Sequence, residues 1–123
     1  METVALLGAS DKKERYAYKA QNMLAEYGHK VIPVSHRVET VDGIPCRPDV
    51  SSIDETIDTV TVYVNPTILQ KIVPEIIAKK PARVILNPGT EDDHIEAQLT
   101  DAGIRVVRAC TLVLLRTDQY MIA

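Results

Sequence analysis

The residues best suited to chemistry follow the first apolar run of the chain, Thr3–Leu7. That run ends at Gly8, and the small residues Ala9 and Ser10 come next. A glycine lets the chain turn tightly, and small neighbours leave backbone N–H groups open to a ligand. A strand, a glycine turn and a helix are typical of the opening of a nucleotide-binding half, where the turn and the positive helix end receive a phosphate.

Three cations stand directly after the glycine turn: Lys12, Lys13 and Arg15. Apolar side chains at helical spacing then predict a helix over Tyr16–Tyr27. Ammonium and guanidinium groups at this position are suited to a pyrophosphate. They are equally compatible with a solvated helix entry, and the sequence leaves both interpretations open.

Strand-like apolar runs recur along the chain and begin about 20 to 30 residues apart, the spacing of βαβ units. The pattern predicts an α/β fold: a Rossmann-like, doubly wound, parallel five-stranded sheet with helices on both faces and strand order 3-2-1-4-5. We expect one domain over residues 1–123, without a linker. The runs are Val4–Leu7, Val31–Val34, Val60–Val64, Val84–Leu86 and Ile104–Val107.

The five predicted strand tips all carry small, polar or proline residues. In an open parallel sheet, ligands bind beyond the carboxyl ends of the strands, where the strand order reverses. The tips of any α/β protein can look like this, but five together beside a glycine turn favour a ligand crevice. They are Gly8–Ser10, Ser35–Arg37, Asn65–Pro66, Asn87–Gly89 and Ala109–Thr111.

The tip of the second strand separates classes of nucleotide. A dinucleotide fingerprint needs G-x-G-x-x-G and an acid at this tip to hold a ribose 2′-OH. Here the tip reads Ser35, His36, Arg37, without an acid. Arg37 suits a ribose phosphate, as in NADP or the 3′-phosphate of coenzyme A, although a solvated arginine is an equal alternative. Pro33 cannot donate to a ladder, so it lies at the sheet margin or faces a ligand.

No catalytic constellation emerges from the sequence, and an enzymatic function is weakly supported. His29, His36 and His94 lie in separate segments, without a nucleophile elbow or triad spacing. Cys46 and Cys110 form no metal or redox motif. Cys110 precedes a possible helix, a position that can lower a thiol pKa and permit a mixed disulfide with a ligand thiol. The favoured interpretation of Cys110 is a small apolar residue that closes the pocket floor.

Composition excludes several partners. The 123 residues carry a formal net charge of -3, so we expect no basic face for nucleic acid. No apolar run approaches a membrane span, and the immediate first strand argues against a signal peptide. We therefore expect a cytoplasmic protein. The apolar stretches Ile68–Ile77 and Leu112–Leu115 leave surface that a homodimer or a protein partner could cover.

Several short motifs, taken in order, resemble the small bacterial CoA-binding domain proteins over about residues 3–116. These motifs are Gly8-Ala9-Ser10, Val31-Ile32-Pro33-Val34 with its polar-basic tip, and Asn65-Pro66. The family is the single-domain form of a Rossmann module. That module also begins the succinyl-CoA synthetase α chain and the ADP-forming acyl-CoA synthetases.

The resemblance implies a place for each part of the ligand. It implies that Gly8–Ser10 wrap the CoA pyrophosphate and that Pro33–Ser35 border the adenosine, with Arg37 near its phosphate. It further implies that Asn65 and Pro66 line the crevice towards the pantetheine.

Two principal functions remain open. The first is a stand-alone CoA or acyl-CoA binding module: a sensor, a carrier or a subunit without catalytic machinery of its own. The second is a small NADP-linked reductase or a nicotinamide-responsive regulator, which Arg37 alone supports. A flavodoxin-like protein–protein module without a nucleotide is a third. If the glycine turn serves a phosphate, a bulky residue at Gly8 should remove binding and largely spare the fold.

Overall fold

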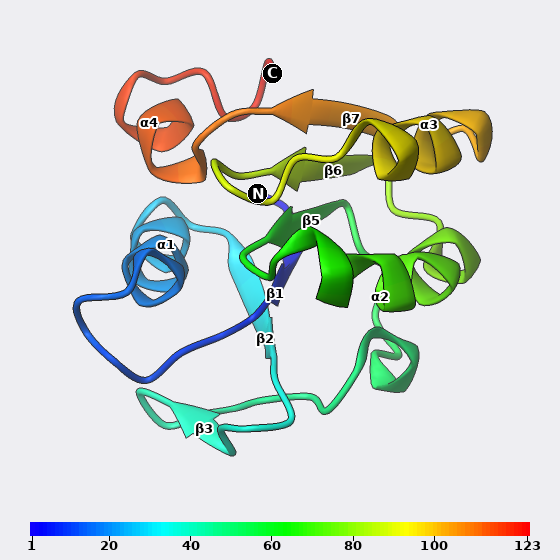
Figure 1. The fold of residues 1–123 in the computed structure, drawn as a ribbon. Helices are drawn as coiled ribbons and strands as arrows, with labels where there is room; N and C mark the ends of the chain where they lie inside the picture. Colours follow the sequence, from blue (N-terminus) through cyan, green and yellow to red (C-terminus); the bar gives the residue numbers. More distant parts are fainter.

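Five parallel strands form the central sheet of the computed structural model, which describes residues 1–123 (Figure 1). The sheet has helices on both faces. The helices α1 and α4 pack together on one face, and α2 packs with α3 and a short 3₁₀ turn, η1, on the other. The sheet strands are β1 (Thr3–Leu7), β2 (Lys30–Val34), β5 (Thr59–Val62), β6 (Arg83–Leu86) and β7 (Arg105–Arg108).

The remaining elements connect these strands. A two-stranded hairpin and η1 link β2 to β5 without a full crossover helix. No helix of the chain combines the length and the apolar character needed to span a membrane. The elements are α1 (Tyr16–Glu26), β3 (Thr40–Val41), β4 (Ile44–Pro45), η1 (Val50–Ser52), α2 (Pro66–Lys79), α3 (Asp93–Asp101) and α4 (Thr111–Arg116).

The predicted α/β class and the five parallel strands are confirmed, with one correction to the strand order. The order is β2-β1-β5-β6-β7. Numbered along the chain within the sheet, this is 2-1-3-4-5, whereas the sequence pattern led us to expect 3-2-1-4-5. The third sheet strand pairs with β1, with Val4 opposite Thr59, because the link after β2 returns to the far side of β1. The reversal of strand order therefore lies between β1 and β5.

Alternation along the buried strands divides the core between the two faces. In β1, Ala5 and Leu7 pack in the cluster beneath α2 and α3. The intervening Val4 and Leu6 pack in the clusters beneath α1 and α4. All four are almost fully buried, as expected for a strand covered on both faces.

The start of α2 shows how the local sequence sets a helix end. Asn65 caps the helix by accepting a hydrogen bond from the Ile68 N–H at 2.9 Å, and Pro66 takes the first helical position. Pro74 sits inside the helix on an exposed position, and the helix continues through it.

The two apolar stretches are divided between core and surface. Leu112 and Leu115 of α4 are buried within the chain, as are Leu69 and Val73 of α2. Ile68 and Val113 in the same stretches are exposed. Pro33 lies on an edge strand, the first of the two alternatives expected for it.

Candidate nucleotide-binding site

A cleft of about 680 Å³ opens at the carboxyl ends of β1, β2 and β5. It lies where the strand order reverses between β1 and β5, the position at which doubly wound sheets bind ligands. Most of the binding residues predicted from the sequence line it: Gly8, Ala9, Ser10, Arg15, Val34, Ser35, Arg37 and Asn65.

Four predicted residues do not line the cleft. Lys13 is exposed beside it, whereas Lys12 does line it. Pro33 is buried, and its carbonyl accepts a hydrogen bond from the Arg47 N–H at 2.9 Å on the outer side of β2. Pro66 serves as the first residue of α2. Cys110 packs against the apolar cluster beneath α1 and α4.

The glycine turn is shaped by contacts within the chain. Gly8 has φ +86°, and a Cβ placed there would lie 2.9 Å from both the Tyr63 carbonyl oxygen and Val64 Cγ1. The N–H groups of Gly8 and Ala9 both donate to the Val34 carbonyl at 3.1 Å, so they are not free for a ligand. This corrects two expectations: the first two amides of the turn are occupied, and a larger residue at position 8 would disturb the fold itself.

Free amide donors appear further along, at the start of α1. The N-cap Arg15 makes no side-chain capping bond, and the first turn carries no acid. The N–H groups of Tyr16, Ala17 and Tyr18 have no acceptor within the chain. Because Arg15, Tyr16 and Ala17 line the cleft, the unsatisfied positive end of α1 adjoins it.

Cations surround this helix end without protein partners. Lys12, Arg15 and Arg37 are exposed, and none forms an ion pair with the chain. Asp11 is the one acid that lines the cleft, and it belongs to the first loop rather than to the β2 tip. At the β2 tip, Ser35 Oγ accepts hydrogen bonds from the N–H groups of Arg37 and Val38 and holds the loop in a turn. The cleft can therefore receive an anion.

An apolar wall that sequence reasoning missed completes the cleft. Ile68 and Ile72 of α2 line it together with Val38, Tyr63 and Val64. Ile68 is 37% exposed, a large apolar side chain left open to solvent. The signal in the sequence was the breadth of the apolar stripe of α2, which is wider than a buried face requires.

The tips of β6 and β7 do not join the cleft. Asn87, after β6, is buried and donates to Thr61 Oγ1 at 2.7 Å, while its Oδ1 accepts from the Thr111 N–H at 2.9 Å. Thr61 and Thr111 are themselves bonded through their hydroxyls at 2.8 Å. The Tyr63 hydroxyl is buried nearby without a partner, and burial raises the pKa of Tyr63 well above its ordinary value. This network fixes α4 to the sheet.

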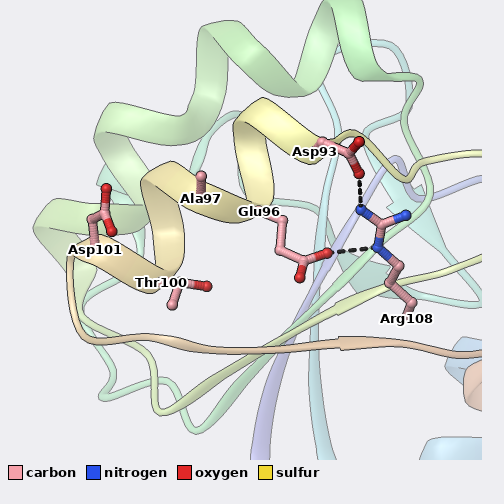
Figure 2. A pocket seen from close by; sticks show the side chains of 6 residues that line it. All are labelled: Asp93, Glu96, Ala97, Thr100, Asp101 and Arg108. Carbon is pink, nitrogen blue, oxygen red and sulfur yellow. Dashed lines mark hydrogen bonds and ion pairs between the residues drawn. The ribbon is translucent and has the colours of Figure 1, made fainter.

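A second hollow, of about 410 Å³, is lined by residues of α3 and by Arg108 at the end of β7 (Figure 2). In it, Arg108 donates to Asp93 Oδ1 and to Glu96 Oε1, each at 2.6 Å. These two bonds raise the pKa of Arg108. The hollow shares no residue with the cleft.

The sheet order, the cleft at the strand reversal and the uncapped helix end are typical of nucleotide-binding α/β domains. Comparison with known families is more specific: residues 2–116 match the family described as the CoA binding domain. The chain belongs to that family.

Solved structures and a curated protein resemble the chain to different extents. An uncharacterized protein of known crystal structure is 39% identical, with 97% of this chain and 98% of that one covered and a TM-score of 0.92. A protein from Thermus thermophilus is 30% identical, with 96% and 90% covered and a TM-score of 0.88. The ADP-forming acetate–CoA ligase of Methanocaldococcus jannaschii is 24% identical over 74 residues, which are 60% of this chain and 10% of the ligase. The chain therefore matches only about a tenth of that curated relative.

Proposed function

We propose that the chain binds coenzyme A or an acyl-CoA in the cleft and acts as a binding module: a sensor, a carrier or a subunit of a larger assembly. Membership of the CoA-binding family supports the ligand. The observation that carries the proposal is the uncapped start of α1, which adjoins the cleft beside unpaired Lys12 and Arg15.

The geometry suggests how the ligand lies. The pyrophosphate meets the amides of Tyr16 and Ala17 and the side chains of Lys12 and Arg15, because a helix end and free cations both favour negative charge. The 3′-phosphate on the ribose meets Arg37 at the β2 tip. In this pose the apolar groups of the ligand lie along the wall formed by α2.

The proposed pose assigns particular roles to the β1 and β5 tips. Gly8 and Ala9 frame the cleft, and Ser10 is the first residue of the turn whose N–H makes no bond within the chain. Asn65 lines the cleft while its side chain caps α2, so its contact with ligand is through its remaining surface. A contact between Cys110 and the ligand thiol is not part of this pose.

A calorimetric cycle with two ligands and two proteins tests the proposal. Coenzyme A should bind more tightly than dephospho-coenzyme A, which lacks the 3′-phosphate, by about tenfold, because a charge-assisted bond is lost. Arg37→Ala should remove that difference and leave dephospho-coenzyme A binding unchanged. Arg116→Ala, an exposed arginine on α4, is the matched control and should preserve the difference.

Two outcomes would overturn the proposal. One is the absence of heat with coenzyme A and acetyl-coenzyme A from a sample that melts cooperatively. The other is binding of NADP that coenzyme A does not displace, which would favour a nicotinamide-responsive protein.

A further inference from the structure

The loop that follows β2 carries two residues of the cleft and is held at both of its ends. Arg37 and Val38 of this loop line the cleft. At the start of the loop, Ser35 Oγ accepts hydrogen bonds from the N–H groups of both residues, at 3.1 and 3.3 Å. At its far end, the Arg47 N–H donates to the Pro33 carbonyl at 2.9 Å, and the Arg47 carbonyl accepts the Ser35 N–H at 3.0 Å. The loop therefore leaves β2 and returns to it.

The Arg47 side chain makes a second connection, away from β2. Its guanidinium donates to both carboxylate oxygens of Glu55, from Nη1 to Oε1 at 3.2 Å and from Nη2 to Oε2 at 3.0 Å. An arginine bonded to both oxygens of a carboxylate is fixed in orientation as well as in distance. The two side chains are only 33% and 29% exposed, whereas the ion pairs that contribute little are fully solvated ones. The hydrogen bonds from Arg47 lower the pKa of Glu55 to about 2, so the carboxylate is ionised at neutral pH.

The segment that carries Glu55 is fixed to α2. Ile53 is buried in the core beneath α2, and η1 packs against the same helix (Figure 1). The Ser51 N–H and hydroxyl both donate to Glu75 Oε1 of α2, at 3.1 and 3.0 Å. Lys79, near the end of α2, donates to the Ile53 carbonyl. Glu55 therefore stands on a segment that α2 holds in place.

The pair of Arg47 and Glu55 thus joins the two sides of the cleft. On one side is the β2 loop with Arg37 and Val38, and on the other is α2 with Ile68. Neither member of the pair lines the cleft itself. The Arg37 side chain is exposed and forms no ion pair with the chain, so its position depends on the loop that carries it.

We propose that Arg47, through its pair with Glu55, is a positioning residue that holds the β2 loop and Arg37 where the 3′-phosphate of the ligand binds. The inference rests on the proposed function, because that function assigns Arg37 to this phosphate. A loop ordered by the fold spares the ligand the entropic cost of ordering it on binding. A residue outside the cleft thereby contributes to recognition of the nucleotide.

Calorimetry with coenzyme A and dephospho-coenzyme A tests the inference. The ratio of the two dissociation constants measures what the 3′-phosphate contributes, and it should be about tenfold in the wild type. Arg47→Met removes the guanidinium but keeps the backbone bonds of the loop and the length of the side chain. Its ratio should fall to about threefold or less, because Arg37 must then be ordered by the ligand. Dephospho-coenzyme A should bind this variant as it binds the wild type.

Arg108→Met is the matched control. Arg108 also donates to two carboxylate oxygens, those of Asp93 and Glu96, and none of these three residues lines the cleft (Figure 2). This variant should keep the ratio of about tenfold. A general loss of stability would affect both methionine variants, so a ratio that falls only in Arg47→Met separates positioning from stability.

A background without Arg37 shows whether Arg47 acts through it. Once Arg37→Ala has removed the contact with the 3′-phosphate, adding Arg47→Met should change coenzyme A affinity by less than about twofold. A further loss for coenzyme A that dephospho-coenzyme A does not share would mean that Arg47 contacts the phosphate itself, and it overturns the inference. A ratio of about tenfold in Arg47→Met alone overturns it as well.

Hydrogen exchange of the ligand-free protein separates this inference from the proposed function. The Arg37 and Val38 amides should exchange faster in Arg47→Met than in the wild type, and at the wild-type rate in Arg108→Met. Equal protection in Arg47→Met and the wild type overturns the hold of Arg47 on the loop, whatever the protein binds. Faster exchange in Arg47→Met together with no binding of coenzyme A to the wild type instead overturns the proposed function, and the role of Arg47 in recognition with it.

Discussion

The starts of α1 and α3 answer the same physical need in opposite ways. At α3, the Asp92 side chain accepts the Ile95 N–H at 2.9 Å, and Asp93 and Glu96 place negative charge in the first turn. At α1, no side chain caps the helix and no acid stands in the first turn. A helix end without a cap can be satisfied by water or by a ligand. The difference shows that α3 is capped by its own chain, and it supports the anion site proposed at the start of α1.

The largest expected effect comes from placing a side chain at Gly8, in the turn that leads from β1 towards α1. Gly8→Val should destabilise the protein by about 3 kcal/mol or more, since it adds strain at positive φ to a clash with the Tyr63 carbonyl. Urea denaturation measures the loss. Gly103→Ala is the control: its φ is +85° but nothing lies within 4 Å of the added Cβ, so about 1 kcal/mol of strain should remain alone. Equal losses in the two variants would show that the contact is unimportant.

A capping carboxylate at the start of α1 would make this helix end resemble that of α3 and so tests the difference between them. Arg15→Asp places a carboxylate at the N-cap, whose backbone is already extended as a cap requires. The protein should gain about 1 kcal/mol of stability, while coenzyme A binding should weaken about tenfold or more. Thermal melts and calorimetry report the two changes. A variant that is more stable and binds unchanged would remove α1 from the site.

Removing the cap of α3 gives the reverse case. Asp92→Ala should lower the free energy of unfolding by about 1 kcal/mol, measured by urea denaturation, because the Ile95 N–H loses its acceptor. Coenzyme A binding should be unchanged, because α3 does not line the cleft. Weakened binding in this variant would mean that the two helix ends are not independent.

The smallest effect concerns pH near α3. Glu91 accepts a hydrogen bond from the Gly89 N–H at 2.8 Å, and backbone hydrogen bonds lower the pKa of Glu91 from its ordinary value. A carboxyl with a depressed folded pKa stabilises the protein above its unfolded pKa, and the contribution disappears as the pH falls through the folded value. Glu91→Gln should therefore have a lower melting temperature than the wild type at pH 7, and the difference should shrink as the pH falls below the ordinary pKa of a glutamate. A gap that persists at low pH would assign the effect to something other than ionisation.

The sequence predicted where the strands lie along the chain better than it predicted which strands pair in the sheet. Apolar runs and β-branched residues marked all five strands: β1, β5 and β6 are buried almost throughout, whereas β2 is buried only in part and β7 no more than half-buried. The pairing of Val4 with Thr59 leaves no trace in periodicity, because it depends on the path of the β2–β5 link. The strand order was accordingly the part of the fold that the pattern missed.

The residues of the candidate site likewise fall into those that spacing predicts and those that only the packed structure reveals. Gly8, Ser35 and Asn65 could be selected because a tip residue after a buried strand is readable from spacing. Asn87 has the same sequence signature, but its amide is consumed by Thr61 and Thr111, which only the packed structure reveals. The uncapped start of α1 could not be read from the sequence, because the acids Asp11 and Glu14 stand just before this helix and are compatible with a capping box. Only the structure shows that neither of them caps it.

The Val34 carbonyl accepts two amides of the first turn and ties β1 to β2 without outside help. The frame of the cleft is thus formed without a ligand, and release of a ligand need not break these hydrogen bonds within the chain. If coenzyme A binds here as proposed, the cost of ordering the glycine turn is met by the fold itself and not by the binding step.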